Sequence, residues 1–589
     1  MKQIYKILSM AALVFAGALT SCCADQFEEP LQPQEGGNTV TLTATVGFDA
    51  STKALTAAGV KTFAADETIA VFYTNESSNL VKTTYTFTAG DLIDGGRRAT
   101  ITVSMTDPKA GGAMKYIYPA SMAKDDGSVN YNALKSQNGT LATIATKYDL
   151  AVYEGTLTGD AALPSGVTLS NQLAILELTV KNAGSSVNGS VTKLSVFDGT
   201  NAYRIIDRSA VDEPIYVALR PVTSDKTIHF CATTDNKKIY RKSVSDKTLD
   251  RNNIYPVNLT TTETTGTALE FLTTDFEAQN GDILSGILLG SYKISTASTG
   301  INDPAITVWL DGVDINNSYA IAPGAPGINC KGNTNLVLAA GSVNHVTACT
   351  NSNGYAGIYI KNDMTLTISG SGSLTATGKG DISNYYGGAG IGSSFRDNGG
   401  NVVITGGTIT ATGGFGAAGI GGGAYGRQNR TCGNISISGG NVTATGGFWG
   451  AGIGSGMVYP ERDEGFNQCG NINITGGTIT ATGGSYAAGI GGGYAQNGAH
   501  ADGHVICGTI TITSGVTRVA ATKGYDSIDS IGRGDKTRAT QKCGTITIGC
   551  TLDGDGKPVG GTVYWDGSYY KNGGDTYLTT SPLVYEPQP

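Results

Sequence analysis

The sequence is poor in charge, in proline and in histidine. Charged residues make up 15% of its 589 residues, the net charge is −8, and there are only 16 Pro and 4 His. Without an excess of positive charge the chain has no electrostatic attraction for nucleic acid or for an anionic membrane, so we predict neither as a partner. Amphipathic helical spacing is also missing, which excludes a core built from helices.

Long apolar runs are missing too, apart from one at the N-terminus. The residues from Ile7 to Leu19 are almost all apolar and follow Lys2 and Lys6. This run is too short for a mature transmembrane helix and is typical of a secretory signal. We therefore predict a signal peptide over residues 1–21 and no membrane span after it.

The end of the signal carries a short motif. Leu19-Thr20-Ser21-Cys22 resembles the lipobox of bacterial lipoproteins. The resemblance implies a lipid anchor on Cys22 in the outer membrane and a surface location. Cys23 is the alternative anchor, and a plain secretory signal is the alternative interpretation. Residues 22–38 combine proline, glycine and acids, which predicts a flexible tether.

Glycine, by contrast, is abundant. The 85 Gly do not follow the collagen period of three, which indicates many tight turns between short strands. From Thr39 to Thr262 apolar and polar residues alternate, as in Val40–Val46 and Leu173–Val180. The pattern predicts an all-β protein in which residues 39–262 form a β-sandwich domain of two lobes, divided near residue 150.

Four segments of this region occur in the order found in fimbrillin-like lipoproteins. They are Asp66–Phe72, Tyr116–Ser121, Leu169–Ala174 and Asn253–Leu259. The region resembles type V (Mfa-like) pilin subunits. The resemblance implies transthyretin-like β-sandwich lobes and an exported lipoprotein. It also implies polymerisation with other pilin subunits by strand exchange, after a protease removes the first strand.

One feature departs from this family. Maturation there is directed by arginine, yet the first Arg of this chain is Arg97, inside the first lobe. Lys53 or Lys61 is a possible substitute for the missing cleavage site. Otherwise the subunit stays lipid-anchored or caps a fibre instead of extending it.

A repeat begins after Gly300. A Gly-Ile pair recurs every 29 to 41 residues, at Ile328, Ile358, Ile391, Ile420, Ile453 and Ile490, with a degenerate copy at Ile531. Each repeat contains three short alternating strands separated by glycine corners, which predicts a parallel, right-handed β-helix over residues 301–552. Because the end coils of such a stack need covers, we predict a linker or cap over 263–300 and a cap or tail over 553–589.

The segments Val308–Ile315 and Met364–Gly372, with the Gly-Ile coils, are similar to a secreted bacterial β-helix family. That family binds cellulose and pectin-like polysaccharide. The similarity implies that the chain binds carbohydrate, with a polysaccharide or a host glycan as its partner. No cofactor is predicted.

Three sets of residues recur at equivalent positions of successive coils. Cys432, Cys469, Cys507 and Cys543 each precede a coil-opening glycine, and neighbours are either bridged as Cys432–Cys469 and Cys507–Cys543 or form a reduced, buried ladder. Aromatic residues precede the Gly-Ile pair and are either an exposed platform for sugar rings or a buried corner stack: Tyr385, Tyr386, Phe415, Phe448, Trp449, Tyr486 and Tyr525. Thr-Ala-Thr runs at 375–377, 410–412, 443–445 and 480–482 give outward threonine columns, which reflect strand preference or a flat face for crystalline polysaccharide or ice.

The later coils lengthen after the Gly-Ile strand, and such insertions often form the binding face. The predicted ligand-binding residues are Tyr425, Arg427, Trp449, Tyr459, Glu461, Arg462, Asp463, Tyr494, His500, Asp502 and His504. A metal held by the His500–His504 segment is an alternative to a solvated loop, and we predict no metal site.

Catalysis is not predicted. Pectin-cleaving β-helices need carboxylates on the strands of one face, but here outward strand positions are Thr, Ser and Asn. The only dense acidic group is Glu461, Asp463 and Glu464. We therefore predict a surface-anchored fimbrial-type adhesin or minor tip pilin, with no catalytic residues. The alternatives are a polysaccharide lyase or hydrolase that uses the loop carboxylates, and a purely structural stalk.

Overall fold

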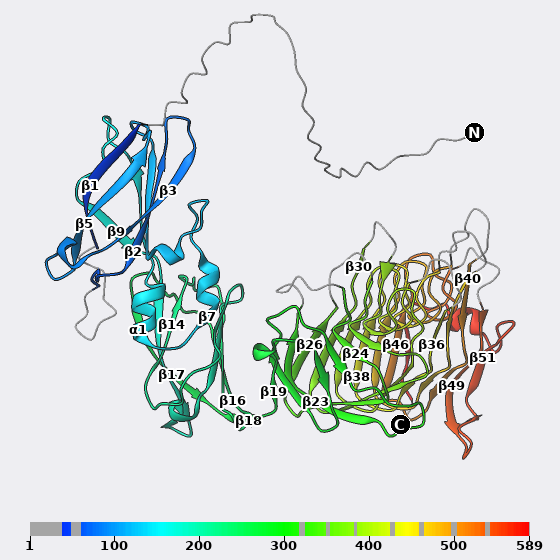
Figure 1. The fold of residues 1–589 in the computed structure, drawn as a ribbon. Helices are drawn as coiled ribbons and strands as arrows, with labels where there is room; N and C mark the ends of the chain where they lie inside the picture. Colours follow the sequence, from blue (N-terminus) through cyan, green and yellow to red (C-terminus); the bar gives the residue numbers. More distant parts are fainter. Residues whose placement is uncertain are drawn as a thin grey trace, which may run out of the picture.

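The computed structural model describes residues 38–48, 61–316, 324–348, 354–381, 386–424, 430–458, 465–495, 503–535 and 542–587. Two β-sandwich lobes lead into a long stack of β-coils (Figure 1). The fold is all-β, as predicted, and ends in a parallel β-helix. Within the described residues no helix has the length and hydropathy to cross a bilayer.

The first lobe is one eight-stranded sheet that wraps around a core. Its strands, in spatial order, are β3 (Leu80–Thr86), β2 (Thr68–Thr74), β6 (Ala113–Tyr118), β8 (Ala151–Thr156), β9 (Val167–Asn171), β1 (Thr39–Phe48), β5 (Arg98–Thr106) and β4 (Leu92–Ile93), with η1 (Ala89–Asp91) beside β4. Inward residues such as Val46, Ile101 and Tyr116 are buried because alternate strand residues face the same side.

The second lobe packs two sheets around its own core. One sheet holds β11 (Ser185–Ser186), β10 (Ala174–Asn182), β14 (Ile215–Leu219) and β17 (Ile254–Thr261). The other holds β18 (Glu263–Thr265), β16 (Lys238–Val244), β15 (Ile228–Thr233), β12 (Lys193–Phe197), β13 (Ala202–Ile205) and β7 (Ser136–Gln137). Short helical turns complete it: η2 (Ala120–Met122), η3 (Tyr131–Lys135), α1 (Leu141–Thr143), η4 (Ile144–Tyr148) and η5 (Asn188–Ser190).

A single lobe boundary near residue 150 does not describe this arrangement. The chain enters the second lobe before β7 and then returns to the first for β8 and β9. It returns because β8 pairs with β6 and β9 pairs with β1, and these pairings close the first sandwich.

Lys61 is not an accessible cleavage site in this fold. It is 5% exposed, and its Nζ lies 3.0 Å from Oδ1 of the buried Asp149. Burial lowers the pKa of Lys61 despite the opposing effect of Asp149. A protease must bind an extended, exposed segment, so the suggestion that Lys61 directs maturation is wrong for the folded lobe. Lys53 and Cys22 lie outside the described residues.

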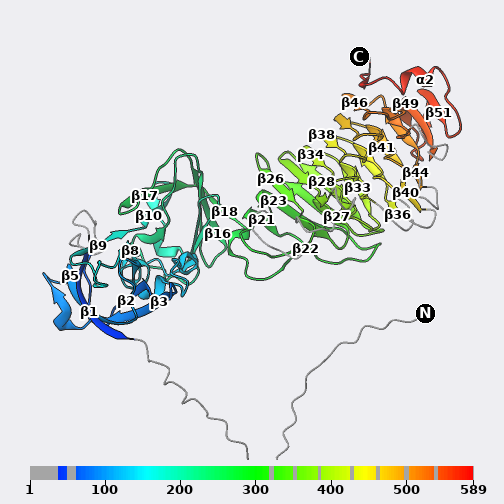
Figure 2. The same cartoon turned by 90° about the horizontal axis from the view of Figure 1, so that it is seen from above.

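The stack is built from parallel ladders, named here A to D in the order in which a coil visits them (Figure 2). The A ladder is β19 (Thr267–Ala268), β21 (Ile283–Ile287), β23 (Ile306–Ile315), β25 (Thr334–Leu338), β28 (Thr365–Gly370), β33 (Asn401–Ile404), β37 (Ile435–Ile437), β41 (Ile472–Ile474), β45 (Ile510–Thr513) and β49 (Thr545–Leu552). The B ladder is β26 (Val343–Thr347), β29 (Ser373–Thr377), β34 (Thr408–Thr412), β38 (Asn441–Thr445), β42 (Thr478–Thr482) and β46 (Arg518–Thr522), and it also pairs with the end of β23.

The C ladder carries the Gly-Ile repeat. It is β20 (Phe276–Ala278), β22 (Ile294–Thr296), β24 (Ile328–Cys330), β27 (Ile358–Ile360), β32 (Ile391–Gly392), β35 (Ile420–Gly421), β39 (Ile453–Gly454), β43 (Ile490–Gly491) and β47 (Ile531–Gly532). A short hairpin of β30 (Gly380–Asp381) and β31 (Tyr386–Gly387) precedes β32. The later coils add a fourth strand, not the three expected, and these strands form the D ladder: β36 (Arg430–Cys432), β40 (Gly465–Cys469), β44 (Gly503–Cys507) and β48 (Lys542–Cys543).

One continuous core runs through the stack. The inward residues of one coil repeat in the next, as Ile435, Val442 and Ile453 show, and all three are at most 1% exposed. Parallel pairing places equivalent side chains about 4.8 Å apart, so each coil buries the apolar face of its neighbour. The residues from Thr267 to Thr296 already pair in the A and C ladders, so they form an opening coil rather than a separate linker.

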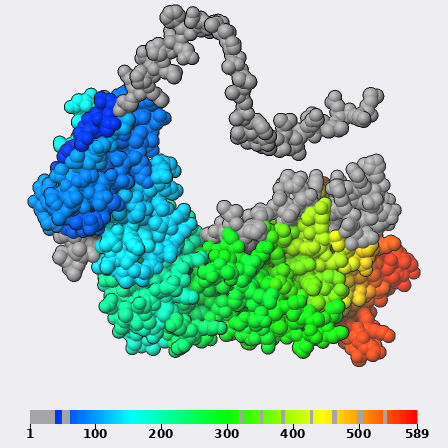
Figure 3. Space-filling view, viewed as in Figure 1, coloured from blue at the N-terminus to red at the C-terminus, as the bar shows by residue number. Residues whose placement is uncertain are grey.

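The second lobe covers the open start of the stack (Figure 3). Arg241 of β16 donates to both carboxylate oxygens of Glu270, which lies in η6 (Leu269–Phe271), at 3.2 and 2.9 Å. Arg241 also donates to the main-chain oxygen of Ser285 in the A ladder, and Glu270 accepts the amide of Ile287. The buried ion pair therefore satisfies polar groups of the first coil that no earlier coil could pair with.

The far end is closed by the chain itself. The covering elements are β50 (Pro558–Val559), β51 (Thr562–Asp566), α2 (Gly574–Tyr577) and β52 (Leu583–Tyr585). β51 and β52 pair antiparallel with β49 and β46, which ends the parallel propagation. Trp565 packs on the core and donates its indole N–H to the main-chain oxygen of Cys543 at 3.1 Å.

Candidate functional site

The corner between the B and C ladders is made of stacked glycine turns. A Cβ on Gly447 would lie 1.8 Å from the oxygen of Gly414, and one on Gly450 would lie 1.9 Å from the oxygen of Ala417. Neighbouring turns therefore touch backbone to backbone, and only glycine fits at these points. The remaining turn residues, Phe448 and Trp449, are left to carry their side chains away from the contact.

Aromatic rings from three successive coils meet at this corner. Phe415 and Phe448 stack with centroids 5.7 Å apart and planes 8° apart. Trp449 lies edge-on to both, at 5.1 Å from Phe415 and 5.4 Å from Phe448. Such offset and edge contacts are the favoured geometries of aromatic pairs.

Tyr494 joins this corner to the first part of a lengthened loop. Its ring lies 5.2 Å from Trp449 and 5.1 Å from Tyr486, and its main-chain N–H donates to the oxygen of Trp449 at 3.0 Å. The structure thus brings Trp449 and Tyr494 together, two residues predicted for ligand binding from separate patterns. We call Phe415, Phe448, Trp449, Tyr486 and Tyr494 the aromatic cluster.

The aromatic cluster is neither fully exposed nor a buried corner stack. Phe448 is 53% exposed, and Tyr525 of the next turn is 78% exposed, whereas Phe415, Trp449, Tyr486 and Tyr494 are half-buried. The rings hold one another in place while leaving part of their apolar surface in water. Exposed apolar surface that is held rigidly is typical of a binding site.

Most of the other predicted ligand residues lie outside the described residues. These are Tyr425, Arg427, Tyr459, Glu461, Arg462, Asp463, His500 and Asp502, and Tyr385 of the aromatic series lies outside as well. His504 lies in β44, but its side chain is not described. Their roles stay predictions.

The cysteines stand in register in the D ladder. Cys432 pairs with Cys469, Cys469 with Cys507, and Cys507 with Cys543, and all four are buried free thiols. The neighbouring thiol of Cys432, together with burial, raises the pKa of Cys469 well above its usual value. Cys507 and Cys543 are related in the same way.

The threonine columns are also in register on the B ladder. Thr410, Thr443 and Thr480 form one column, and Thr412, Thr445 and Thr482 form the other. All are half-buried and face outward from a flat sheet. This regular face borders the corner that carries the aromatic cluster.

The sequence pattern did not reveal a polar groove that spans the first three strands of the C ladder. Its outward residues Glu277, Ser295 and Asn329 come from the C ladder. The sequence feature that could have indicated the groove is the alternation in Phe276–Ala278 and Ile294–Thr296. It marks each segment as a strand with one outward residue.

Comparisons with known proteins support the repeat. Residues 366–395, 402–424, 435–457 and 472–494 match a family model described as a β-helix repeat. No curated protein matches the chain.

Solved structures resemble parts of the chain only distantly. A candidate cell adhesion protein from Bacteroides ovatus is 13% identical, with 39% of this chain and 96% of that chain covered and a TM-score of 0.23. Another from Bacteroides uniformis is 14% identical, with 40% and 98% covered and a TM-score of 0.23. A candidate polysaccharide-binding protein from Bacteroides thetaiotaomicron is 10% identical, with 33% and 76% covered and a TM-score of 0.20. Similarities this weak assign no function to the chain.

Proposed function

We propose that this chain is a cell-surface glycan-binding protein of the adhesin type, which binds its ligand at the aromatic cluster. The observation that carries the proposal is the half-exposed set of rings that spans three coils at one corner. The apolar faces of pyranose rings pack against aromatic surface, and the hydroxyls that flank them remain available to polar neighbours.

The spacing of the coils favours an extended glycan over a single sugar. Successive turns present aromatic side chains about one coil spacing of 4.8 Å apart, and Phe415 and Phe448 are 5.7 Å apart. This repeat is comparable with one pyranose unit of an extended chain. A linear glycan that runs along the stack would therefore meet one turn per sugar.

Binding to a glycan array tests the proposal. We expect the double variant Phe448→Ala/Trp449→Ala to lose affinity at least about tenfold, because both rings contribute exposed apolar contact. Tyr569→Ala is the matched control, since Tyr569 is 59% exposed but lies in the C-terminal cap. Equal binding by the double variant would contradict the proposal, as would release of unsaturated sugars from pectin by the wild type.

We further propose that Cys22 anchors the protein to the outer membrane and that the two lobes act as a fimbrial or tip subunit. The proposal rests on the lipobox-like motif and on the two-lobed β-sandwich. Incorporation of an alkyne-labelled fatty acid should be lost in Cys22→Ser and retained in Cys23→Ser. Gold labelling at one end of purified fibres would support a tip role, and labelling along their length would contradict it.

A further inference from the structure

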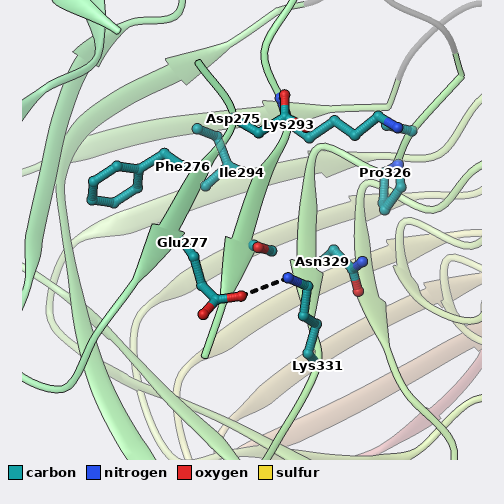
Figure 4. Close-up of a pocket in the computed structure, with 10 residues that line it drawn as sticks. Asp275, Phe276, Glu277, Lys293, Ile294, Pro326, Asn329 and Lys331 are labelled. Carbon is teal, nitrogen blue, oxygen red and sulfur yellow. Dashed lines mark hydrogen bonds and ion pairs between the residues drawn. The ribbon is translucent and has the colours of Figure 1, made fainter. Parts of the chain in front are cut away.

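The first three strands of the C ladder form a groove of about 270 Å³ (Figure 4). Glu277, Ser295 and Asn329 occupy equivalent outward positions in successive coils, because Glu277 pairs with Ser295 and Ser295 with Asn329. A carboxylate, a hydroxyl and an amide therefore line up one coil apart. The aromatic cluster belongs to later coils, so the two features are separate.

An ion pair forms one wall of this groove. Lys331, just after β24, reaches back across the coil of Ser295 to Glu277 in β20, with Nζ 2.6 Å from Oε2. Both side chains remain part-exposed, at 39% and 47%. The pair is accessible from the groove and presents a fixed donor beside a fixed acceptor.

Two polar groups in the groove have no hydrogen-bond partner among the residues that the structure describes. Ser295 is only 8% exposed, yet its hydroxyl makes no hydrogen bond within the described residues. The half-buried amide of Asn329 makes none there either. The hydroxyl of Ser295 and the amide of Asn329 lie side by side in the lining of the groove, so a ligand placed there can supply the hydrogen-bond partners that the described residues do not.

The charges of the groove balance. Asp275 and Glu277 oppose Lys293 and Lys331, and the carboxylate of Asp275 also accepts the main-chain N–H of Lys293 at 2.9 Å. A balanced lining offers no net attraction to an anion or a cation. The groove therefore favours an uncharged polar ligand.

An apolar edge lies next to the amide. Ala325 and Pro326 precede β24 and line the groove on the side of Asn329. Figure 4 shows Pro326 above Asn329 and the contact between Glu277 and Lys331 to the left of it. An amide is both donor and acceptor, so it complements another amide, and the adjacent apolar edge fits a methyl group.

We propose that this groove binds an N-acetylated hexosamine. The amide of Asn329 pairs with the acetamido group, whose methyl packs on Ala325 and Pro326. The sugar hydroxyls bond to Ser295 and to the Glu277–Lys331 pair. The site is independent of the aromatic cluster and adds an end-recognition site near the start of the stack.

Saturation-transfer NMR and calorimetry on the full chain test this proposal with N-acetylglucosamine, glucose and glucuronate as probes. We expect N-acetylglucosamine to bind at least about fivefold more tightly than glucose or glucuronate, and Asn329→Ala and Ser295→Ala each to weaken it about fivefold. The control is Asn335→Ala, which removes a half-buried amide from β25, the A-ladder strand that follows β24. Unchanged melting curves show that the variants fold.

Three results would overturn the proposal: equal binding of glucose, tighter binding of glucuronate, or unchanged binding by both groove variants. The Phe448→Ala/Trp449→Ala variant should retain N-acetylglucosamine binding. Failure at the groove can thus be told from failure at the aromatic cluster.

Discussion

Arg241 of the second lobe and the buried Glu270 of the opening coil form a part-buried, two-point ion pair that joins the sandwich to the stack. Their side chains are 27% and 6% exposed, and Nη2 lies 2.9 Å from Oε2. Both partners also bond to main-chain groups of the A ladder. The junction is therefore held by an ion pair and by hydrogen bonds to the main chain of the first coil.

We expect Arg241→Met to lower the free energy of unfolding by about 3 kcal/mol, because it leaves the Glu270 carboxylate buried and unpaired. Urea denaturation measures the loss. Asp125→Asn is the control: its surface pair with Lys82, in which Asp125 is 97% exposed, should cost under about 1 kcal/mol. If the two variants lowered the free energy of unfolding equally, the Arg241–Glu270 pair would contribute no more to stability than a surface ion pair.

The glycine that ends each of the last five C strands, from β32 to β47, should be irreplaceable. Gly454 has φ 138°, and a Cβ there would lie 2.0 Å from the oxygen of Gly491. Gly454→Ala should cost about 3 kcal/mol or more, because the strain propagates to the next coil. Gly554→Ala is the control, since nothing lies within 4 Å of its Cβ. Thermal unfolding of both variants checks the difference.

The cysteine ladder should oxidise in fixed pairs. Cys432 has the largest influence on the Cys469 thiol and Cys543 on the Cys507 thiol, so we expect those two disulfides and no Cys469–Cys507 bond in protein produced in an oxidising compartment. Mass spectrometry of a non-reducing digest identifies the pairs. Each bond should add about 3 kcal/mol relative to the reduced protein. Four free thiols in protein from that compartment would refute the pairing.

The C-terminal cap should weaken in acid. The N–H groups of Tyr569 and Ser568 and the ammonium of Lys571 hold the pKa of Asp566 at about 2, below its usual 3.8. A depressed folded-state pKa contributes stability above the unfolded value and loses it as the pH falls through the folded value. Wild-type stability should therefore drop more steeply than that of Asp566→Asn between about pH 4 and about pH 2. Urea denaturation at each pH measures the free energy of unfolding of both proteins. An equal decrease for the two proteins across that range would contradict the role given to Asp566.

The local patterns of the sequence were enough to predict the repeat. Ile435, Val442 and Ile453 face inward because strand side chains alternate, and glycine marks the turns because backbone must touch backbone there. The all-β class and the parallel β-helix follow from this periodicity. The predicted meeting of equivalent cysteines follows too, since stacking in register is a property of the repeat.

Contacts between distant segments were decided only by the tertiary structure. One example is the return of β8 and β9 to the first lobe. Others are the contact of Lys61 with Asp149 and that of Arg241 with Glu270. Each joins residues that no sequence repeat relates. The same holds for Tyr494 against Trp449 and for Lys331 reaching Glu277 across the groove. Sequence determines which residues must be inside a coil, because burial follows local alternation. Which surface residues converge depends on how whole coils and lobes are stacked, which no local pattern encodes.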